Sequence, residues 1–341
     1  MTAAPMTLNP SDLAIDLSDV AKTYRGRVDA LRGISMQVRR GEIFGLLGPN
    51  GAGKSTLVKI LMSVVRPTRC QGTMLGRPVG SRQALLRVGY LPENPRFPEY
   101  LTGEQTLHTF AMLSKVPRDL RRSLAEKTLR LVGMSDWRRK KIGAYSKGMK
   151  QRIGIAQALM NDPELVMLDE PTDGVDPVGR REIREMLIAI KAEGRTVFVN
   201  SHLLSEVETL CDRVAILVKG KVARQGAIDD LTRSSRRYEV EIAGPPPSAE
   251  PVRRMIAALR GQESGHDAVT TYSLPGADAE EVQPLIDALR AAGVTVRALR
   301  PARQSLEDLF MEAIVDPETG KHGGVGAAQA GRRPGNQPGV R

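Results

Sequence analysis

A glycine-rich stretch that ends in lysine and serine is the part of the chain whose residue types most clearly indicate chemistry. It follows the pattern G-x-x-x-x-G-K-[ST], in which backbone N–H groups surround phosphate oxygens and the next helix points its N-terminus at the same anion. Lys54 can reach β- and γ-phosphates, and Ser55 can ligate Mg²⁺. The pattern predicts a nucleotide phosphate site made of Gly48, Pro49, Asn50, Gly51, Ala52, Gly53, Lys54, Ser55 and Thr56.

Two carboxylates follow a second apolar run, Leu165–Leu168. In open α/β sheets, ligands bind at the carboxyl ends of the strands. Asp169 can hold Mg²⁺, and Glu170, one residue further on, can polarise the water that attacks a γ-phosphate. An apolar strand that ends in Asp-Glu is by itself often a surface turn. Together with the glycine-rich loop, it predicts a hydrolytic site.

These residues need a sheet to bring them together. The apolar run Ile43–Leu47 ends at the glycine-rich loop, and Thr56–Val65 shows helical spacing after it. Strand, loop and helix in this order are typical of an α/β nucleotide fold. Residues 12–40 alternate between apolar and polar pieces, as an antiparallel edge does. Further strands of a mostly parallel sheet are expected at Val88–Leu91, Leu165–Leu168, Thr196–Asn200 and Val214–Val218.

A helical insertion interrupts the sheet at about residues 92–161. Thr102 and Gln105 form a capping box ahead of the helix Thr106–Leu113. Pro117 begins a second helix, which Gly133 can close. Other helices are expected at Lys147–Met160, Arg180–Lys191 and Leu203–Leu210.

The composition changes after residue 235, where Gly244 and three prolines break any regular element. We expect a small α+β domain at 236–316 and disorder at 317–341, which is rich in glycine, alanine and arginine. Residues 1–11 are expected to be a flexible N-terminus. The small domain has strand-like segments Tyr238–Ile242, Val269–Ser273 and Val294–Leu299, and helix-like segments Val252–Leu259, Ala279–Ala291 and Leu306–Ile314.

Composition excludes several classes of protein. The two cysteines have no pairing or metal-type spacing, which fits a reducing compartment. The chain contains no apolar run near the roughly 20 residues that span a bilayer, so we expect it not to cross a membrane. A net charge of +11 could indicate a nucleic-acid-binding protein. Aromatic residues, on which bases would stack, make up only 4% of the chain, and part of the excess positive charge lies after Glu318. No nucleic-acid partner is expected.

Four further segments, in the same order, resemble the ATP-binding-cassette (ABC) ATPase family over about 12–235. Residues 145–152, Tyr-Ser-Lys-Gly-Met-Lys-Gln-Arg, resemble its signature sequence, Leu-Ser-Gly-Gly-Gln. Residues 173–176 resemble the loop after the catalytic carboxylate. His202 resembles the switch histidine, and Tyr24 stands where the family keeps an aromatic residue that stacks on adenine.

The resemblance implies an ATPase subunit of a transporter that uses ATP and Mg²⁺. Two chains would sandwich two ATP molecules head to tail, so the signature residues of one chain act on the ATP of the other. His202 would sense the γ-phosphate. The implied signature residues are Ser146, Lys147, Gly148 and Met149, the dimer loop is Asp173, Gly174 and Asp176, the metal ligands are Ser55, Glu93 and Asp169, and the catalytic residues are Glu170, His202 and Lys54.

Three positions depart from the commonest family pattern. Lys147 replaces glycine, Met149 replaces glutamine, and Glu93 replaces a glutamine that normally contacts Mg²⁺. The variants resemble exporters of the type-2 ABC subfamily, whose C-terminal extension the segment Leu299–Phe310 also resembles. Lys147 could contact either phosphate or solvent.

The implied partners are a transmembrane permease, docked near Glu93–Leu101, and a second copy or a paralogue, because the chain has one phosphate loop. The implied location is the cytoplasmic side of the cell membrane, and the sequence does not reveal the cargo. Two alternatives stay open. A DNA-maintenance ATPase would need a long heptad insertion between Lys54 and Asp169, where short helices are expected instead. A ribosome-acting protein would typically carry two cassettes.

Overall fold

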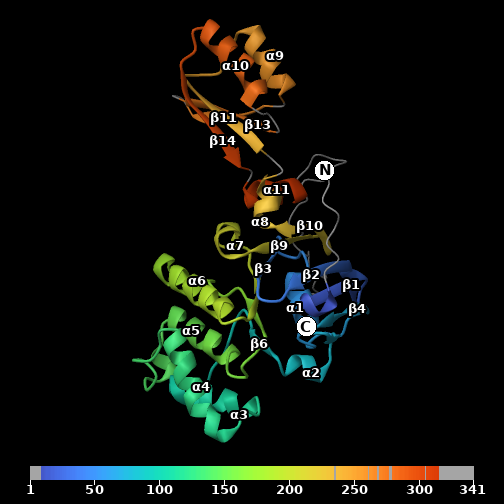
Figure 1. Ribbon diagram of the computed structural model, residues 1–341, viewed down its shortest axis with the longest axis vertical. Coiled ribbons are helices and arrows are strands. Elements are labelled where there is room, and N and C mark those ends of the chain that lie inside the picture. The colour runs from blue at the N-terminus through green and yellow to red at the C-terminus, as the bar shows by residue number, and fades with distance from the viewer. Residues whose placement is uncertain are drawn as a thin grey trace, which may run out of the picture.

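The structure is a computed structural model that describes residues 9–233, 236–259, 261–266, 269–275, 279–303 and 305–314. The expectations for residues 1–8 and 317–341 lie outside these ranges. Within the described ranges the strands form three sheets, and helices pack against them (Figure 1).

A six-stranded sheet carries the phosphate loop and the two carboxylates. Its order is β10-β9-β3-β8-β7-β6, and neighbouring strands are parallel except for β10 and β9. Every residue of β3, β7 and β8 is buried, because apolar layers cover both faces of the sheet. The strands are β3 (Ile43–Leu47), β6 (Val88–Leu91), β7 (Leu165–Asp169), β8 (Thr196–Asn200), β9 (Arg213–Val218) and β10 (Lys221–Ala227).

One face of this sheet packs against an antiparallel sheet of order β2-β1-β4-β5. Helix α1 shares the apolar layer between them, in which Phe44 and Phe198 stack with ring centroids 5.8 Å apart. This arrangement explains the apolar–polar alternation of residues 12–40. The elements are η1 (Pro10–Asp12), β1 (Leu13–Tyr24), β2 (Val28–Arg39), α1 (Lys54–Leu61), β4 (Arg69–Met74), β5 (Arg77–Pro78) and α2 (Arg82–Leu85).

Helices cover the other face. The predicted capping box is confirmed: Thr102 Oγ1 accepts from Gln105 N at 3.2 Å, and Gln105 Oε1 accepts from Thr102 N at 2.9 Å. In Figure 1, α3, α4 and α5 form a group at the end of the molecule opposite α9 and α10. The elements are α3 (Gly103–Leu113), α4 (Arg118–Leu131), η2 (Ile142–Ala144), α5 (Lys147–Ala158), α6 (Pro177–Ala192), α7 (Leu204–Leu210) and α8 (Ile228–Arg233).

A third, antiparallel sheet of order β12-β13-β11-β14 follows. Helices α9 and α10 bury Val240, Tyr272 and Leu285 against it in an apolar core of its own. In Figure 1 this unit extends beyond α8 and α11. The elements are β11 (Arg236–Ala243), α9 (Glu250–Ala258), β12 (Gln262–His266), β13 (Val269–Pro275), α10 (Ala279–Ala291), β14 (Val296–Arg303) and α11 (Leu306–Ile314).

Helix α11 packs away from that third sheet. It contacts α7, α8 and β9, and Leu306 and Leu309 are buried in the same apolar cluster as Val207 and Val214. The sequence prediction grouped Leu306–Ile314 with the small domain, because proximity in sequence was the only guide. In the structure, the last described helix returns to the part of the chain that contains the six-stranded sheet.

Several helix boundaries differ from the sequence prediction, among them the starts of α1 and α6. Helix α1 begins at Lys54 rather than Thr56, because Gly53 takes a left-handed conformation (φ 106°) and serves as its N-cap. Helix α6 begins at Pro177, since the Asp176 side chain caps it. Both shifts come from cap geometry, which apolar spacing does not encode.

The packing of α11 predicts how its leucines affect stability. Leu306 is 0% exposed, whereas Met311 on the same helix is 43% exposed. We expect Leu306→Ala to lower the free energy of unfolding by about 2–5 kcal/mol through loss of burial and a new cavity. Met311→Ala should change it by no more than about 0.5 kcal/mol. Denaturant titration of both variants tests this, and equal midpoints would contradict the packing of α11.

Candidate functional site

A cavity of about 410 Å³ lies at the carboxyl end of the parallel strands. It unites the glycine-rich loop with two acidic side chains from distant parts of the sequence, Glu93 after β6 and Glu170 after β7. Ala30 of β2 closes one side. The lining residues are Ala30, Pro49, Asn50, Gly51, Ala52, Gly53, Lys54, Ser55, Thr56, Glu93 and Glu170.

The glycines are required where the loop passes close to other backbone. A Cβ on Gly48 would lie 2.4 Å from the Leu217 carbonyl oxygen, and one on Gly53 would lie 2.5 Å from that of Ala30. Gly51 also has a positive φ, of 81°, but a Cβ there meets nothing within 4 Å. The loop therefore turns back on itself and delivers α1 with its N-terminus facing the cavity.

Lys54 is held within the loop. Its side chain is buried, and Nζ donates to Gly48 O at 2.6 Å and to Pro49 O at 3.4 Å. Burial lowers the pKa of Lys54, and the carboxylates of Glu170, Asp169 and Glu93 act in the opposite sense. The ammonium is thus fixed on backbone carbonyls, next to where phosphate oxygens would enter.

Asp169 is buried at the end of β7, and the Asn200 amide Nδ2 donates to its Oδ1. Burial raises the pKa of Asp169; the hydrogen bond from Asn200 lowers it, and the negative charges of Glu93 and Glu170 raise it further. A buried carboxylate crowded by other acids has a strong electrostatic demand for a cation.

Glu170 is held in a left-handed conformation, with φ 52°, which is uncommon for a residue with a Cβ. Its N–H donates to Asn200 O at 2.8 Å, and its Oε2 lies 2.8 Å from His202 Nδ1. Glu170 lines the cavity, whereas Asp169 is buried at the end of β7 and is not part of that lining. His202, predicted from its place after β8, contacts Glu170 directly.

Sequence reasoning missed three supporting residues. Gln151 is buried and donates to Glu170 O at 3.3 Å. Asn200 was counted only as the end of a strand. Thr172 Oγ1 donates to Glu206 Oε2 at 2.5 Å, which ties the segment after Glu170 to α7. A polar residue that ends an apolar run is a signal that could have identified Asn200, whereas Gln151 stands between Lys150 and Arg152 and carries no such signal.

The segment around Ser146 lies outside the cavity lining. Ser146 caps α5 by accepting from Met149 N at 3.2 Å. Lys147 Nζ lies 3.0 Å from Asp173 Oδ2 and passes so close to Gly174 that a Cβ there would be 1.9 Å away. In this structure Lys147 therefore contacts the loop that follows Glu170 in the same chain.

Two other predicted residues also lie apart from the cavity lining. Asp176 caps α6, with Oδ1 accepting from Gly179 N at 2.9 Å, and this hydrogen bond lowers its pKa. Tyr24 ends β1, is 39% exposed and has Lys22 Nζ 4.9 Å from its ring centroid. It pairs with Val28 in the hairpin that also carries Ala30, so one turn separates it from the cavity.

The residues present fit a divalent cation that is shared with a nucleotide. Mg²⁺ is usually bound by one or two carboxylates together with substrate phosphates. Ser55 and Glu93 line the cavity beside the buried carboxylate of Asp169. Within the described part of the chain, no cluster of three or more His, Cys, Asp or Glu could hold a metal alone. Buried Asn200 Oδ1, which has no hydrogen-bond partner among the described residues, marks an unused acceptor at this edge.

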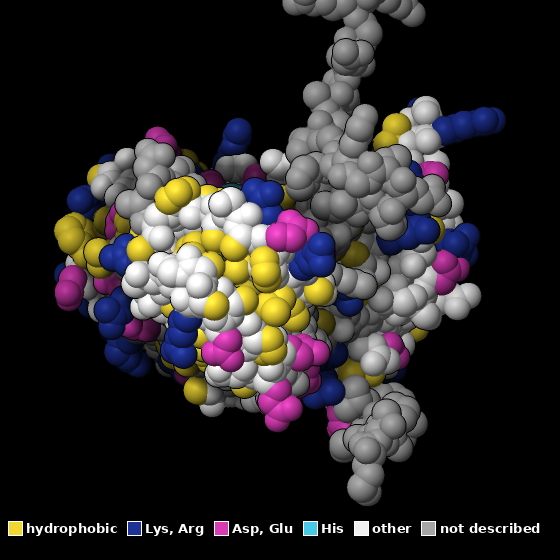
Figure 2. Space-filling view, turned by 90° about the horizontal axis from the view of Figure 1, so that it is seen from above, with side chains coloured by type: hydrophobic (Ala, Val, Ile, Leu, Met, Phe, Trp, Pro, Cys, Tyr) yellow, Lys and Arg dark blue, Asp and Glu magenta, His cyan; other side chains and the backbone are white. Residues whose placement is uncertain are grey.

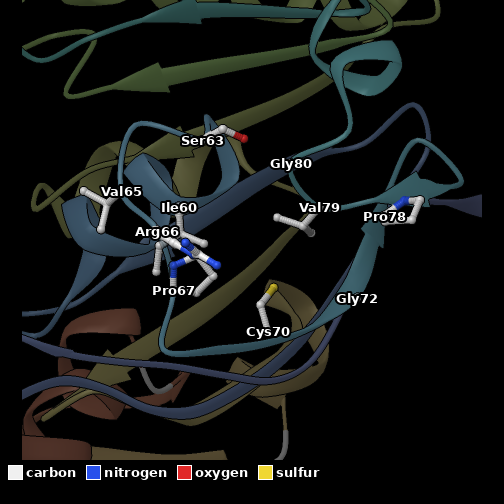
Figure 3. A pocket seen from close by; sticks show the side chains of 10 residues that line it. All are labelled: Ile60, Ser63, Val65, Arg66, Pro67, Cys70, Gly72, Pro78, Val79 and Gly80. Atoms are coloured by element: carbon white, nitrogen blue, oxygen red, sulfur yellow. The ribbon is translucent and has the colours of Figure 1, made fainter.

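Another cavity, of about 320 Å³, lies between the end of α1 and the strands β4 and β5. The Cys70 side chain stands among Ile60, Arg66 and Val79 on its wall (Figure 3). Burial raises the pKa of Cys70, so the thiol stays protonated near neutral pH. The ten residues that line this cavity include no carboxylate and no histidine. Its lining thus offers no group for acid–base chemistry.

Seen from the end that carries α9 and α10, acidic, basic and apolar side chains are interspersed (Figure 2). That face therefore has a mixed charge rather than a basic stripe. Among the described residues, none of the helices combines the length and apolar character needed to cross a bilayer.

A parallel sheet, a glycine-rich loop between β3 and α1, and Asp-Glu at the end of β7, one strand removed from β3, define a P-loop nucleoside triphosphatase. Comparisons with known proteins agree. The family model described as "ABC transporter" matches residues 31–173. An uncharacterized ABC transporter ATP-binding protein of Nostoc sp. is 41% identical over 325 residues, covering 93% of this chain and 94% of that protein.

Two further relatives share the fold and the family. A fluoroquinolones export ATP-binding protein of Mycobacterium tuberculosis is 41% identical over 220 residues, which cover 63% of this chain and 71% of that protein. A solved ATP-binding subunit of an ABC transporter has 30% identity and a TM-score of 0.59, covering 65% of this chain and 92% of that one.

This chain belongs to the family of ABC transporter ATP-binding proteins. It is an ATPase subunit of a transporter, and it binds and hydrolyses ATP. The alternative of a ribosome- or DNA-acting ATPase has no support from the relatives.

The loop geometry predicts that two glycines differ in their tolerance of a methyl group. Gly53→Ala adds a collision with the Ala30 backbone to the cost of a positive φ, whereas Gly51→Ala carries only the conformational cost, about 1–2 kcal/mol. We expect Gly53→Ala to weaken ATP binding at least tenfold more than Gly51→Ala does. Equilibrium binding of a fluorescent ATP analogue measures both, and equal losses would contradict the close approach at Gly53.

Proposed function

We propose that this chain hydrolyses Mg²⁺-bound ATP with Glu170 as the base, within a dimer, and that it drives export through a separate membrane permease. The observation that carries the proposal is the contact between Glu170 and His202, 2.8 Å apart at the rim of a cavity that also holds the phosphate loop. Glu170 and Lys54 line that cavity, and the imidazole of His202 contacts Glu170, an arrangement that suits attack of water on a γ-phosphate.

Each residue has a separate task in this proposal. The loop N–H groups and Lys54 hold the β- and γ-phosphates. Ser55, Glu93 and Asp169 hold Mg²⁺, which neutralises phosphate charge when it is bound. Glu170 orients the attacking water and accepts its proton, while His202 steadies the γ-phosphate. The water oxygen bonds to phosphorus as the bond to the ADP oxygen breaks, and ADP and phosphate leave.

A second cassette, either another copy or a paralogue, completes the site. The segment Ser146–Met149 lies outside the cavity of its own chain, and Ser146 caps α5, whose N-terminus is free to face an anion. We assign Ser146, Lys147, Gly148 and Met149 to the ATP of the partner, and Asp173, Gly174 and Asp176 to the dimer contact. Tyr24 is assigned to adenine. Closure depends on the γ-phosphate because both chains bind it.

The permease is proposed to dock in a groove between the edge strand β6 and the helical region. The groove consists of two adjoining cavities, of about 270 and 520 Å³, and Ser114 lines both of them. Leu86 and Leu120 in their walls are 53% and 52% exposed. The predicted docking segment Glu93–Leu101 follows β6 directly and carries Tyr100, which is 74% exposed.

Export and a location on the cytoplasmic side of the cell membrane complete the proposal. Both follow from the permease partner and from a relative named for fluoroquinolone export. In this proposal the permease selects the cargo.

The role of Glu170 predicts a clear separation of binding from hydrolysis. Glu170→Gln keeps the shape of the side chain but cannot accept a proton. We expect unchanged ATP affinity and a loss of about 10²–10⁴-fold in hydrolysis rate. ATP-bound dimers should accumulate, which size-exclusion chromatography with ATP would detect.

Glu185→Gln is the matched control, because Glu185 is exposed on α6 and pairs with Arg181 on the same helix. It should hydrolyse ATP at the normal rate. If Glu170→Gln does so too, another group is the base.

The groove predicts which exposed apolar residue the permease needs. Leu120→Glu should abolish retention of a multi-span membrane protein when the tagged chain is purified from gently solubilised membranes, since it places a charge in an apolar contact. Ile188→Glu on α6, where Ile188 is 48% exposed, is the control and should retain the partner. Mass spectrometry with quantification gives the stoichiometry. Equal retention by both variants would move the docking site elsewhere.

A further inference from the structure

Asn200 lies where the two halves of the catalytic site meet. It ends β8, which runs between the phosphate-loop strand β3 and the carboxylate strand β7. In register, Asn200 is paired with Leu46 on one side and with Asp169 on the other. Its neighbour Ser201 donates its N–H to Leu46 O at 3.2 Å, so the end of β8 is also tied to β3.

Asn200 forms hydrogen bonds with both acidic residues, Asp169 and Glu170. Its backbone oxygen accepts from Glu170 N at 2.8 Å, and its side-chain Nδ2 donates to Asp169 Oδ1. An ionised carboxylate only accepts hydrogen bonds, which fixes the orientation of the amide with its NH₂ group toward Asp169. The side chain is 1% exposed, so packing holds this orientation.

The amide oxygen is the unexplained atom. With Nδ2 turned to Asp169, Oδ1 is buried and has no hydrogen-bond partner among the described residues. Buried acceptors without a partner are uncommon and call for an explanation, of which a hydrogen bond from a bound water is one. Mg²⁺ retains several of its waters when it binds to proteins, and those waters are hydrogen-bond donors.

We infer that Asn200 is a positioning residue for the metal: Nδ2 orients the Asp169 carboxylate, while Oδ1 accepts a hydrogen bond from a metal-bound water. The inference rests on the proposed function, in which Asp169 binds Mg²⁺. Asparagine suits both tasks because one planar group presents a donor and an acceptor. Leucine has a similar size and presents neither.

The test compares metal affinity with nucleotide affinity. Mn²⁺ is titrated into the full chain with saturating ATP and followed by electron paramagnetic resonance, and ATP binding is measured separately with EDTA. Asn200→Leu should weaken Mn²⁺ binding about 10–100-fold, as losses of groups that orient metal ligands do. ATP affinity without metal should be unchanged.

Thr196→Val is the matched control. Thr196 is buried at the other end of β8, and its Oγ1 accepts from Gly41 N at 3.0 Å. This variant should lose stability but keep the wild-type affinity for Mn²⁺. If Asn200→Leu also keeps that affinity, Asn200 is only structural and the inference is overturned.

Asp169→Asn separates this inference from the proposed function. If it leaves Mn²⁺ affinity unchanged, the proposed metal site fails and the inference fails with it. If Asp169→Asn weakens binding but Asn200→Leu does not, only the inference fails.

A structure of the wild-type chain with Mg²⁺ and a non-hydrolysable ATP analogue decides the case even if Asn200→Leu does not fold. Asn200 Oδ1 within about 2.5–3.0 Å of a metal-bound water supports the inference. Oδ1 bonded to a protein donor, or facing no water, overturns it.

Discussion

The parallel pairing of β8 with both β3 and β7 is the constraint on which the site depends. The register sets Leu46, Asn200 and Asp169 level with one another at one edge of the sheet. Apolar layers on both faces fix that register, since a one-residue slip would turn buried side chains away from their layer. The phosphate loop follows β3 and Glu170 follows β7. Because these strands are parallel, both lie at the carboxyl end of the sheet.

Three carboxylates and one ammonium lie at that edge of the sheet, so its negative charge is only partly neutralised. The carboxylates of Glu170, Asp169 and Glu93 raise the pKa of Lys54, while burial disfavours the charged forms of Asp169 and Lys54. A nucleotide adds further negative charge, which the proposed Mg²⁺ would offset. The loop N–H groups and the N-terminus of α1 supply the remaining positive potential, and they need no side-chain charge to do so.

The sequence predicted the parts of the site that are encoded locally. The phosphate loop, the strand that ends at Asp169 and the capping box at Thr102 each lie within a few residues, and their local geometry follows from their own sequence. The contacts of Asn200 with Asp169, of Lys147 with Asp173, and of α11 with α7 depend on which segments meet in space. Apolar spacing does not indicate which distant residues will come into contact. The fold class was therefore predictable from the sequence, whereas the supporting residues were not. The residue roles proposed for the dimer remain predictions.

Helix α11 joins the C-terminal part of the chain to the apolar core of the catalytic part. It packs on α7, whose Glu206 accepts from Thr172 in the segment between Glu170 and the loop at Asp173. Removing everything after β10 would expose the side of α7 and β9 that Leu306 and Leu309 cover. A chain truncated there is therefore not an intact ATPase lacking an accessory unit, because it has lost part of its core. The third sheet can be regarded as an insertion between α8 and α11, and the ATP-binding unit is complete only when α11 has returned to it.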